Sequence, residues 1–191
     1  MILGVDLSHY QDVAFWPGLK TAGVSFAYLK ATQGMTLRDP SFVGFAEGCA
    51  EQGIACGAYH FFEPKDDPVI QANFFLSVVG KQAGDLAPVL DWETFSGSPL
   101  MDTEAALEWL QQVEVKTGRT PVIYGSPSPL EALDLDSRFS RYPLWIAEYG
   151  VASPRIPAPW TTYAYWQYTD KGELPCIKGT CDLNYASGIL T

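Results

Sequence analysis

The stretch Pro88-Val89-Leu90-Asp91-Trp92-Glu93 is an apolar run that ends in two acidic residues. If the run is a strand, the alternation of side chains puts Asp91 and Glu93 on one face, about 6.5 to 7 Å apart along the chain. Glycoside hydrolysis needs such a pair, with one acid to protonate the departing oxygen and one carboxylate to stabilise the developing cation. A strand end with two solvated acids is the alternative that this stretch alone leaves open.

Strand-like and helix-like segments alternate on both sides of this stretch, which favours parallel βα units. Pro40 suits the first turn of one predicted helix, and Gly53 suits its C-terminal cap. The predicted strands cover residues 2–7, 24–31, 54–62, 86–92, 121–125, 143–148, 162–168 and 180–184. The predicted helices cover residues 13–22, 40–53, 67–81, 103–117 and 128–136.

The last predicted strands have no helical segment between them, and the proline-rich residues 150–160 do not suit a regular helix. We therefore expect an α/β fold, a TIM-like barrel variant of eight strands and about five helices, (β/α)5(β)3. An open doubly wound sheet is the alternative. No internal repeat or linker divides the chain, so residues 1–191 are expected to form a single domain.

The bulk composition narrows the classes of partner. The chain has 191 residues, 47% of them hydrophobic, which is enough to bury a sizeable core. Its 22 acidic and 12 basic side chains give a formal net charge of -10, and no basic cluster suggests a nucleic-acid partner. No apolar stretch approaches the roughly 20 residues of a membrane helix, so membrane insertion is not expected. We expect a monomer.

The cysteines do not indicate a metal site. Cys49 and Cys56 are predicted to be two buried thiols, while Cys176 and Cys181 flank a short loop that a disulfide would close in an oxidising compartment. Neither spacing matches a zinc motif, and both histidines lie far away in the sequence. No metal and no other cofactor is expected.

Polar residues lie at the ends of nearly all predicted strands. In parallel barrels, catalytic groups gather at the C-terminal ends of the strands. A structural explanation exists for each residue taken alone, because Asp6 suits a turn cap, His60 a hydrogen-bonded core imidazole and Asp182 the start of a turn. Their joint occurrence predicts a site formed by Asp6, Gln33, His60, Asp91, Glu93, Tyr124, Glu148, Gln167 and Asp182.

The ordered set of short motifs in this chain resembles the glycoside hydrolase family 25 lysozymes, also called Chalaropsis-type muramidases. The resemblance covers essentially the whole chain. The motifs are Gly4-Val5-Asp6-Leu7-Ser8-His9-Tyr10-Gln11, Leu29-Lys30-Ala31-Thr32-Gln33-Gly34 with Asp39, Gly57-Ala58-Tyr59-His60-Phe61, Asp91-Trp92-Glu93, Val122-Ile123-Tyr124, Leu144-Trp145-Ile146-Ala147, Trp166-Gln167-Tyr168 and Cys181-Asp182-Leu183-Asn184.

The resemblance implies a barrel of eight strands and five helices, and cleavage of the β-1,4 bond between N-acetylmuramic acid and N-acetylglucosamine in bacterial peptidoglycan. By position, Glu93 matches the proton donor, Asp91 its partner carboxylate, and Asp6 and Asp182 further active-site acids. Family members often carry Glu where this chain has Gln33. The expected sugar contacts are Tyr59, His60, Phe61, Trp92, Tyr124, Trp145, Glu148, Trp166 and Gln167.

The crowding of four acids suggests how the site works. Like charges raise one another's pKa, so at least one carboxyl group should stay protonated near neutrality. Glu93, beside bulky Trp92, is expected to be that acid, whereas Asp91 stays ionised and stabilises an oxocarbenium-like state or orients the substrate's N-acetyl group. The sequence does not distinguish this second role from direct attack by Asp91.

Two other functions remain possible from the sequence. One is a catalytically silent glycan-binding module on the same barrel. The other is a chitinase-like hydrolase, although Val89 and Ala87 stand where its longer motif has further aspartates. If Met1 is the native start, the absence of leader features predicts synthesis in the cytoplasm. Action on the cell wall would then follow release at host lysis, as for a phage endolysin, or secretion if a leader was removed.

Overall fold

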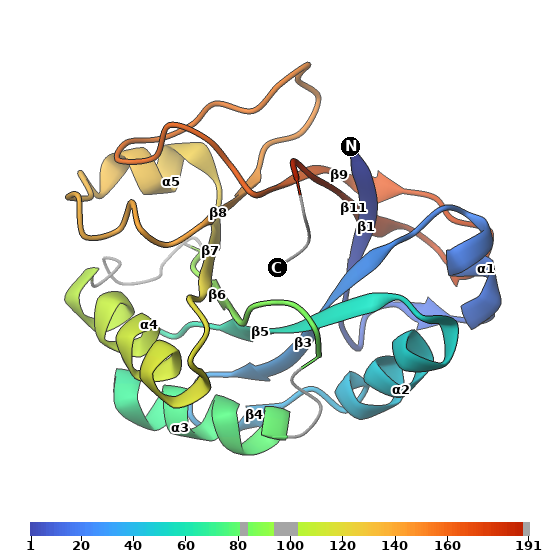
Figure 1. Cartoon of the computed structure of the whole chain (residues 1–191), viewed down its shortest axis with the longest axis horizontal. Helices are drawn as coiled ribbons and strands as arrows, with labels where there is room; N and C mark the ends of the chain where they lie inside the picture. Colours follow the sequence, from blue (N-terminus) through green and yellow to red (C-terminus); the bar gives the residue numbers. More distant parts are fainter. Residues whose placement is uncertain (81–83, 94–102, 189–191) are drawn as a thin grey trace.

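The computed structural model describes residues 1–80, 84–93 and 103–188, and its main sheet closes into a barrel (Figure 1). Each barrel strand pairs with the next around the ring, and the last pairs with the first, so an open doubly wound sheet is excluded. The barrel strands are β1 (Ile2–Leu7), β3 (Phe26–Gln33), β5 (Ala55–Phe61), β6 (Val89–Asp91), β7 (Val122–Gly125), β8 (Leu144–Ala147), β9 (Tyr165–Gly172) and β11 (Cys181–Ala186).

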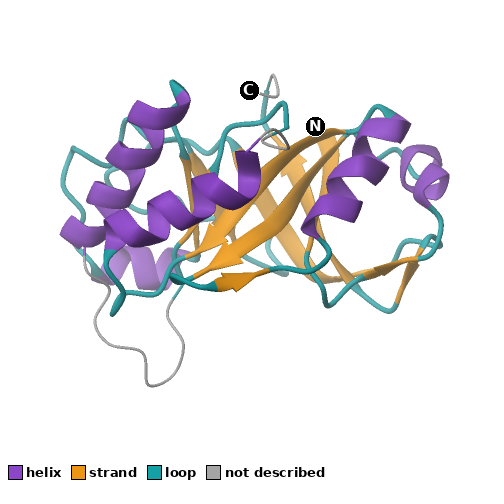
Figure 2. Ribbon diagram, turned by 90° about the horizontal axis from the view of Figure 1, so that it is seen from below, coloured by secondary structure: helices purple, strands orange, loops and turns teal. Residues whose placement is uncertain are grey.

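The described helices connect the first six barrel strands and lie on the outside of the barrel (Figure 2). They are α1 (Trp16–Thr21), α2 (Phe42–Gln52), α3 (Pro68–Val79), α4 (Thr103–Thr117) and α5 (Pro127–Ala132). From β1 to β9 each barrel strand runs parallel to its predecessor, whereas β11 is antiparallel to both β9 and β1. The predicted (β/α)5(β)3 barrel is therefore confirmed.

Local sequence signals explain several element boundaries. The helix α2 ends at Gly53, whose φ of 61° lies in the left-handed region that favours glycine. The helix α3 begins after Asp67, whose side chain accepts hydrogen bonds from two backbone N–H groups of the first turn, and Pro68 occupies the first helical position. Three strands of two residues each were not predicted: β2 (Asp12–Val13), β4 (Leu37–Arg38) and β10 (Ile177–Lys178).

Two apolar layers follow from the alternation of side chains along the strands. Val5 and Leu7 of β1 point outward and belong to a large cluster that includes helix residues such as Phe75 and Trp109. A second, smaller cluster of mostly strand residues fills the barrel interior. Its barrel-strand members are Phe26, Tyr28, Val89, Val122, Tyr124, Trp145, Ala147, Tyr165 and Ala186.

All four cysteines are buried free thiols in this structure. Cys49 and Cys56 thus lie where the sequence predicts, and the loop between Cys176 and Cys181 is not closed by a disulfide. Among the described helices, none combines the length and the apolar character that crossing a membrane requires.

Candidate active site

A pocket of about 340 Å³ opens at the barrel rim where the parallel strands end. Every residue that lines it was predicted from the sequence as a site residue. The lining residues are Asp6, Tyr59, Asp91, Glu93, Tyr124, Trp145, Gln167 and Asp182. Asp182 reaches this rim from the beginning of β11 rather than from a strand end, because β11 runs antiparallel and places Asp182 opposite Asp6.

Asp91 and Glu93 share the inward face at the end of β6, as their spacing predicts. Asp91 is only 6% exposed, and its Oδ1 has no hydrogen-bond partner among the described residues. Its carboxyl group contacts that of Glu93. A buried acceptor without a hydrogen-bond partner is uncommon in folded proteins, so this feature marks Asp91 as a candidate functional residue.

The electrostatics of this pair differ from the expected division of charge. Burial raises the pKa of Asp91 well above its ordinary range, and the adjacent Glu93 carboxylate raises it further. Burial also raises the pKa of Glu93. In the ligand-free protein the proton of this pair is thus not confined to Glu93, because Asp91 is the more deeply buried of the two.

The Asp6 carboxylate is held by a network of side-chain hydrogen bonds. Its Oδ2 accepts from Gln167 Nε2 at 2.9 Å and from Asn184 Nδ2 at 2.8 Å. The oxygen of each amide is also occupied, because Tyr124 donates to Gln167 Oε1 at 2.8 Å and Trp145 Nε1 donates to Asn184 Oδ1 at 2.8 Å. These partners fix the orientation of both amides and hence the position of Asp6.

Asp182 completes the group of four acids. Burial and then the neighbouring Asp6 charge raise the pKa of Asp182 to about 8. Burial raises the pKa of Asp6 as well, although the hydrogen bonds from Asn184 and Gln167 act in the opposite direction. The two aspartates therefore hold a proton between them near neutral pH.

A second cavity of about 850 Å³ adjoins the pocket and shares five lining residues with it, including Asp91 and Glu93. It extends past Phe61, which the sequence predicts as a sugar contact, and past the exposed ring of Tyr10. The residues found only in this extension are Ser8, Tyr10, Gln11, Lys30, Gln33 and Phe61. The two cavities adjoin at these shared residues and together form one groove.

His60 lies outside the groove, so the structure does not support its predicted contact with sugars. The ring is fully buried, stacked on Trp109, and hydrogen-bonded to Thr32 at 2.8 Å and Gln71 at 3.0 Å. Burial lowers the pKa of His60 to about 4, so the ring is neutral. It links β5 to α3 because it points outward, between the inward-facing Tyr59 and Phe61.

Three more predicted sugar contacts also point away from the pocket. Trp92 is fully buried and stacks on Phe139 in the outer layer. Trp166 belongs to that layer too, and its Nε1 donates to the backbone oxygen of Glu148. The Glu148 side chain pairs with Arg155 at 2.9 Å. Trp92, Trp166 and Glu148 each follow an inward-facing residue by one position, so their side chains face the opposite side of the sheet.

Besides Ser8, Tyr10 and Gln11 in the extension of the groove, sequence reasoning missed three residues that contribute to the site. Asn184 binds Asp6, Lys30 lines the second cavity, and Tyr149 donates to Gln167 Oε1 at 2.5 Å. Alternation was the available signal for Asn184 and Lys30, because they stand two positions from Asp182 and from the inward-facing Tyr28. Tyr149 follows β8 in an irregular segment, where no periodic pattern indicates direction.

Comparisons with known proteins agree with this geometry. Lysozyme M1 of Streptomyces globisporus is 31% identical over 200 residues, which cover 98% of this chain and 68% of that protein. The crystal structure of the bacterial lysozyme from Streptomyces coelicolor matches 98% of this chain and 92% of its own, with a TM-score of 0.88 and 29% identity. The catalytic domain of endolysin ply40 from the Listeria monocytogenes bacteriophage P40 matches 98% of this chain and 94% of its own, with a TM-score of 0.81 and 28% identity.

The family assignment follows from a match along most of the chain. The glycosyl hydrolases family 25 pattern covers residues 5–177, which include the ends of β1, β6, β7 and β8 and the pocket residues up to Gln167. The resemblance noted in the sequence is thereby confirmed. This chain belongs to the glycosyl hydrolases of family 25.

Proposed function

We propose that this protein is a muramidase that hydrolyses the β-1,4 bond between N-acetylmuramic acid and N-acetylglucosamine in bacterial peptidoglycan. The observation that carries the proposal is the pair formed by buried Asp91 and half-buried Glu93 at the end of β6, in a pocket that adjoins a second cavity. Family membership and the similarity to lysozymes of two Streptomyces species support the same substrate.

In the proposed reaction Glu93 is the general acid and base. It protonates the departing glycosidic oxygen and later activates the water that completes hydrolysis. Burial raises the pKa of Glu93 above its ordinary value and so favours the protonated form that this role requires, although the hydrogen bond with Asp91 acts in the opposite direction.

Asp91 stabilises the positive charge that develops on the sugar. The Asp91 carboxyl group lines the pocket, and a hydrogen bond to it from an N–H group of the substrate, such as that of the N-acetyl group, favours the ionised form of Asp91. Substrate binding then moves the shared proton toward Glu93.

The decisive test is Glu93→Gln, which keeps the size of the side chain and removes its acid function. We expect the hydrolysis of purified peptidoglycan to fall by about a hundredfold or more. Mass spectrometry of the released fragments should show N-acetylmuramic acid at the new reducing ends for the unaltered protein. Activity of Glu93→Gln within a few-fold of the unaltered protein would contradict the role of Glu93.

Chitin is the control substrate in the same assay. Cleavage of chitin in preference to peptidoglycan would favour the chitinase-like alternative. Binding to peptidoglycan without any release of fragments by the unaltered protein would favour a glycan-binding module.

A further inference from the structure

Lys30 is a buried cation beside the candidate catalytic pair. The residue is 8% exposed, and its Nζ donates to Gln33 Oε1 at 2.9 Å and lies 4.8 Å from the ring centre of Phe61. Within the described part of the chain, no carboxylate oxygen lies within 4.0 Å of this ammonium group. Buried lysines usually have an ionic partner, so this arrangement calls for a functional explanation.

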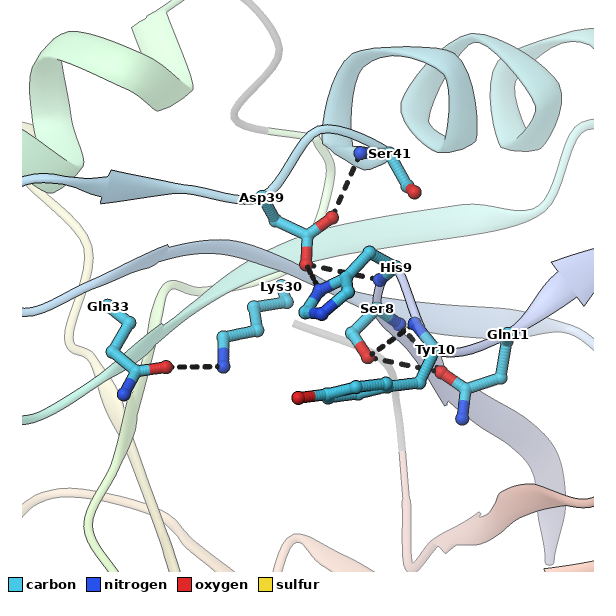
Figure 3. Close-up of polar contacts among 8 residues, drawn as sticks. All are labelled: Ser8, His9, Tyr10, Gln11, Lys30, Gln33, Asp39 and Ser41. Atoms are coloured by element: carbon cyan, nitrogen blue, oxygen red, sulfur yellow. Dashed lines mark hydrogen bonds and ion pairs between the residues drawn. The ribbon is translucent and has the colours of Figure 1, made fainter.

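A local irregularity of β3 brings Lys30 and Gln33 to the same cavity. Lys30 points into the barrel like Tyr28, but the register with β5 shifts between Lys30 and Thr32. The shift turns Thr32 outward to His60 and lets Gln33 face the cavity. Figure 3 shows the ammonium group of Lys30 meeting the amide oxygen of Gln33.

The Lys30 side chain on β3 reaches toward the Asp91–Glu93 pair at the end of β6, across the intervening strand β5. Its Nζ lies over Phe61, and Phe61 stands beside Asp91 in the register of β5 and β6. Lys30, Asp91 and Glu93 line one cavity, and among the residues that the structure describes no other lysine or arginine lines either part of the groove. Gln33 is neutral, and its Nε2 donates to Glu63 at 2.7 Å. The positive charge of Lys30 is thus directed at the pair without being cancelled by Gln33.

We propose that Lys30 is a positioning residue that keeps one carboxylate of the Asp91–Glu93 pair ionised, and that Gln33 preserves this effect because an amide holds the ammonium group without neutralising it. The kinetic part of this inference rests on the proposed muramidase function, but the charge effect itself does not.

Lys30 and the other groups around the Asp91–Glu93 pair shift the pKa values of the two carboxyl groups in opposite directions. Lys30 lowers the pKa of both Asp91 and Glu93, whereas burial and the nearby acids raise both. Loss of the lysine charge should therefore raise both pKa values and move both limbs of the pH–activity profile to higher pH. Among the described residues, the other titratable groups that line the groove with the pair and Lys30 are Asp6, Asp182, Tyr59, Tyr124 and Tyr10.

Three single variants test the proposal. Lys30→Met removes the charge, and Gln33→Glu pairs the ammonium with a carboxylate. Gln11→Glu is the matched control, since it adds the same charge to the same cavity away from Lys30, and its Oε1 can still accept from the Ser8 backbone N–H. The measurements are the carboxyl titration of Asp91 and Glu93 by carbon-13 NMR and the pH profile of kcat/KM on soluble peptidoglycan fragments.

We expect Lys30→Met and Gln33→Glu to raise the titration midpoints and both limbs of the profile by about half a pH unit or more. Gln11→Glu should give less than half of that shift. A folded Lys30→Met protein without the shift, or equal shifts in the two Gln→Glu variants, would overturn the proposal. If Lys30→Met does not fold, the comparison of Gln33→Glu with Gln11→Glu decides alone. If the unaltered protein does not hydrolyse peptidoglycan, the proposed function fails, and the NMR titration still decides the role of Lys30.

Discussion

Asp6 and Asp91 are two buried aspartates that line the same pocket, yet the protein holds them in different ways. Asp6 lies where β1 meets the antiparallel strand β11, and two side-chain amides donate to one of its oxygens. Asp91 lies among parallel strands, and its Oδ1 has no hydrogen-bond partner among the described residues. The burial of the two residues is nearly equal, at 7% and 6% exposed.

We infer from this difference that Asp6 is a scaffold residue, which holds the structure of the site, and that Asp91 is the aspartate that acts on the substrate in the proposed reaction. A buried acceptor without a partner costs about 1 to 3 kcal/mol of folding stability. The protein carries that cost at Asp91, beside Glu93 in the pocket, and avoids it at Asp6. We therefore expect substitutions at Asp91 to affect activity far more than stability, and substitutions at Asp6 to affect both.

The largest effect should be that of Asp91→Asn on activity. The amide keeps the shape of the carboxyl group but cannot carry the negative charge that stabilises the developing cation. We expect hydrolysis of peptidoglycan to fall by about a hundredfold or more, with urea unfolding changed by less than about 1 kcal/mol. If Asp91→Asn strongly destabilised the protein, Asp91 would be a scaffold residue like Asp6, and the proposed difference between the two aspartates would be wrong.

The next effect concerns stability and compares Asp6→Ala with Asp91→Ala. Removing Asp6 leaves the N–H donors of Gln167 and Asn184 without their acceptor, so we expect a loss of about 2 kcal/mol or more. Asp91→Ala removes one oxygen that lacks a partner and a single contact, with Glu93, so it should cost clearly less. Urea denaturation of the two variants at one pH measures the difference, and equal losses would contradict the distinction.

The alternation rule shows how much of this site the sequence contains. It places Asp91 and Glu93 on one face, and the structure puts both in the pocket. Applied to every strand, the same rule turns His60, Trp92 and Trp166 away from that face. Strand-end position alone is thus an incomplete signal, because neighbouring residues at a strand end face opposite sides of the sheet.

Other parts of the site depend on contacts between distant segments. The antiparallel direction of β11 puts Asp182 beside Asp6, although the two are far apart in the sequence, and no local pattern specifies that direction. The shift in β3 that brings Gln33 into the groove is equally invisible in the sequence, since it arises from pairing with β5. The closure of the barrel, in which β1 pairs with β11, therefore decides which residues of the predicted elements become neighbours in the site.

A smaller, pH-dependent effect should come from Asp182, on the same side of the barrel as Asp6. Its pKa of about 8 in the folded protein lies above the ordinary aspartate value of 3.8, so the folded state holds a proton that the unfolded state has lost between these values. The free energy of unfolding should therefore decrease as pH rises from about 5 to 8.

Asp182→Asn should make that decrease shallower, because the amide does not titrate. Asp6, Asp91 and Glu93 also have raised pKa values, so part of the decrease should remain. Urea denaturation of both proteins at several pH values measures the slopes. Identical slopes would show that the Asp6–Asp182 pair does not hold its proton as the structure indicates.

The smallest single effects should be those of Tyr124→Phe and Tyr149→Phe. Both hydroxyl groups donate to Gln167 Oε1, so either one can keep the amide in the orientation that serves Asp6. Each variant alone should change the stability by about 1 kcal/mol or less and the activity by a few-fold. The double variant leaves the amide oxygen without these donors and lets Gln167 rotate away from Asp6, so its loss should exceed the sum of the single losses. Additive losses in a double-mutant cycle would mean that the two tyrosines act separately and that the Asp6 network is less rigid than its hydrogen bonds indicate.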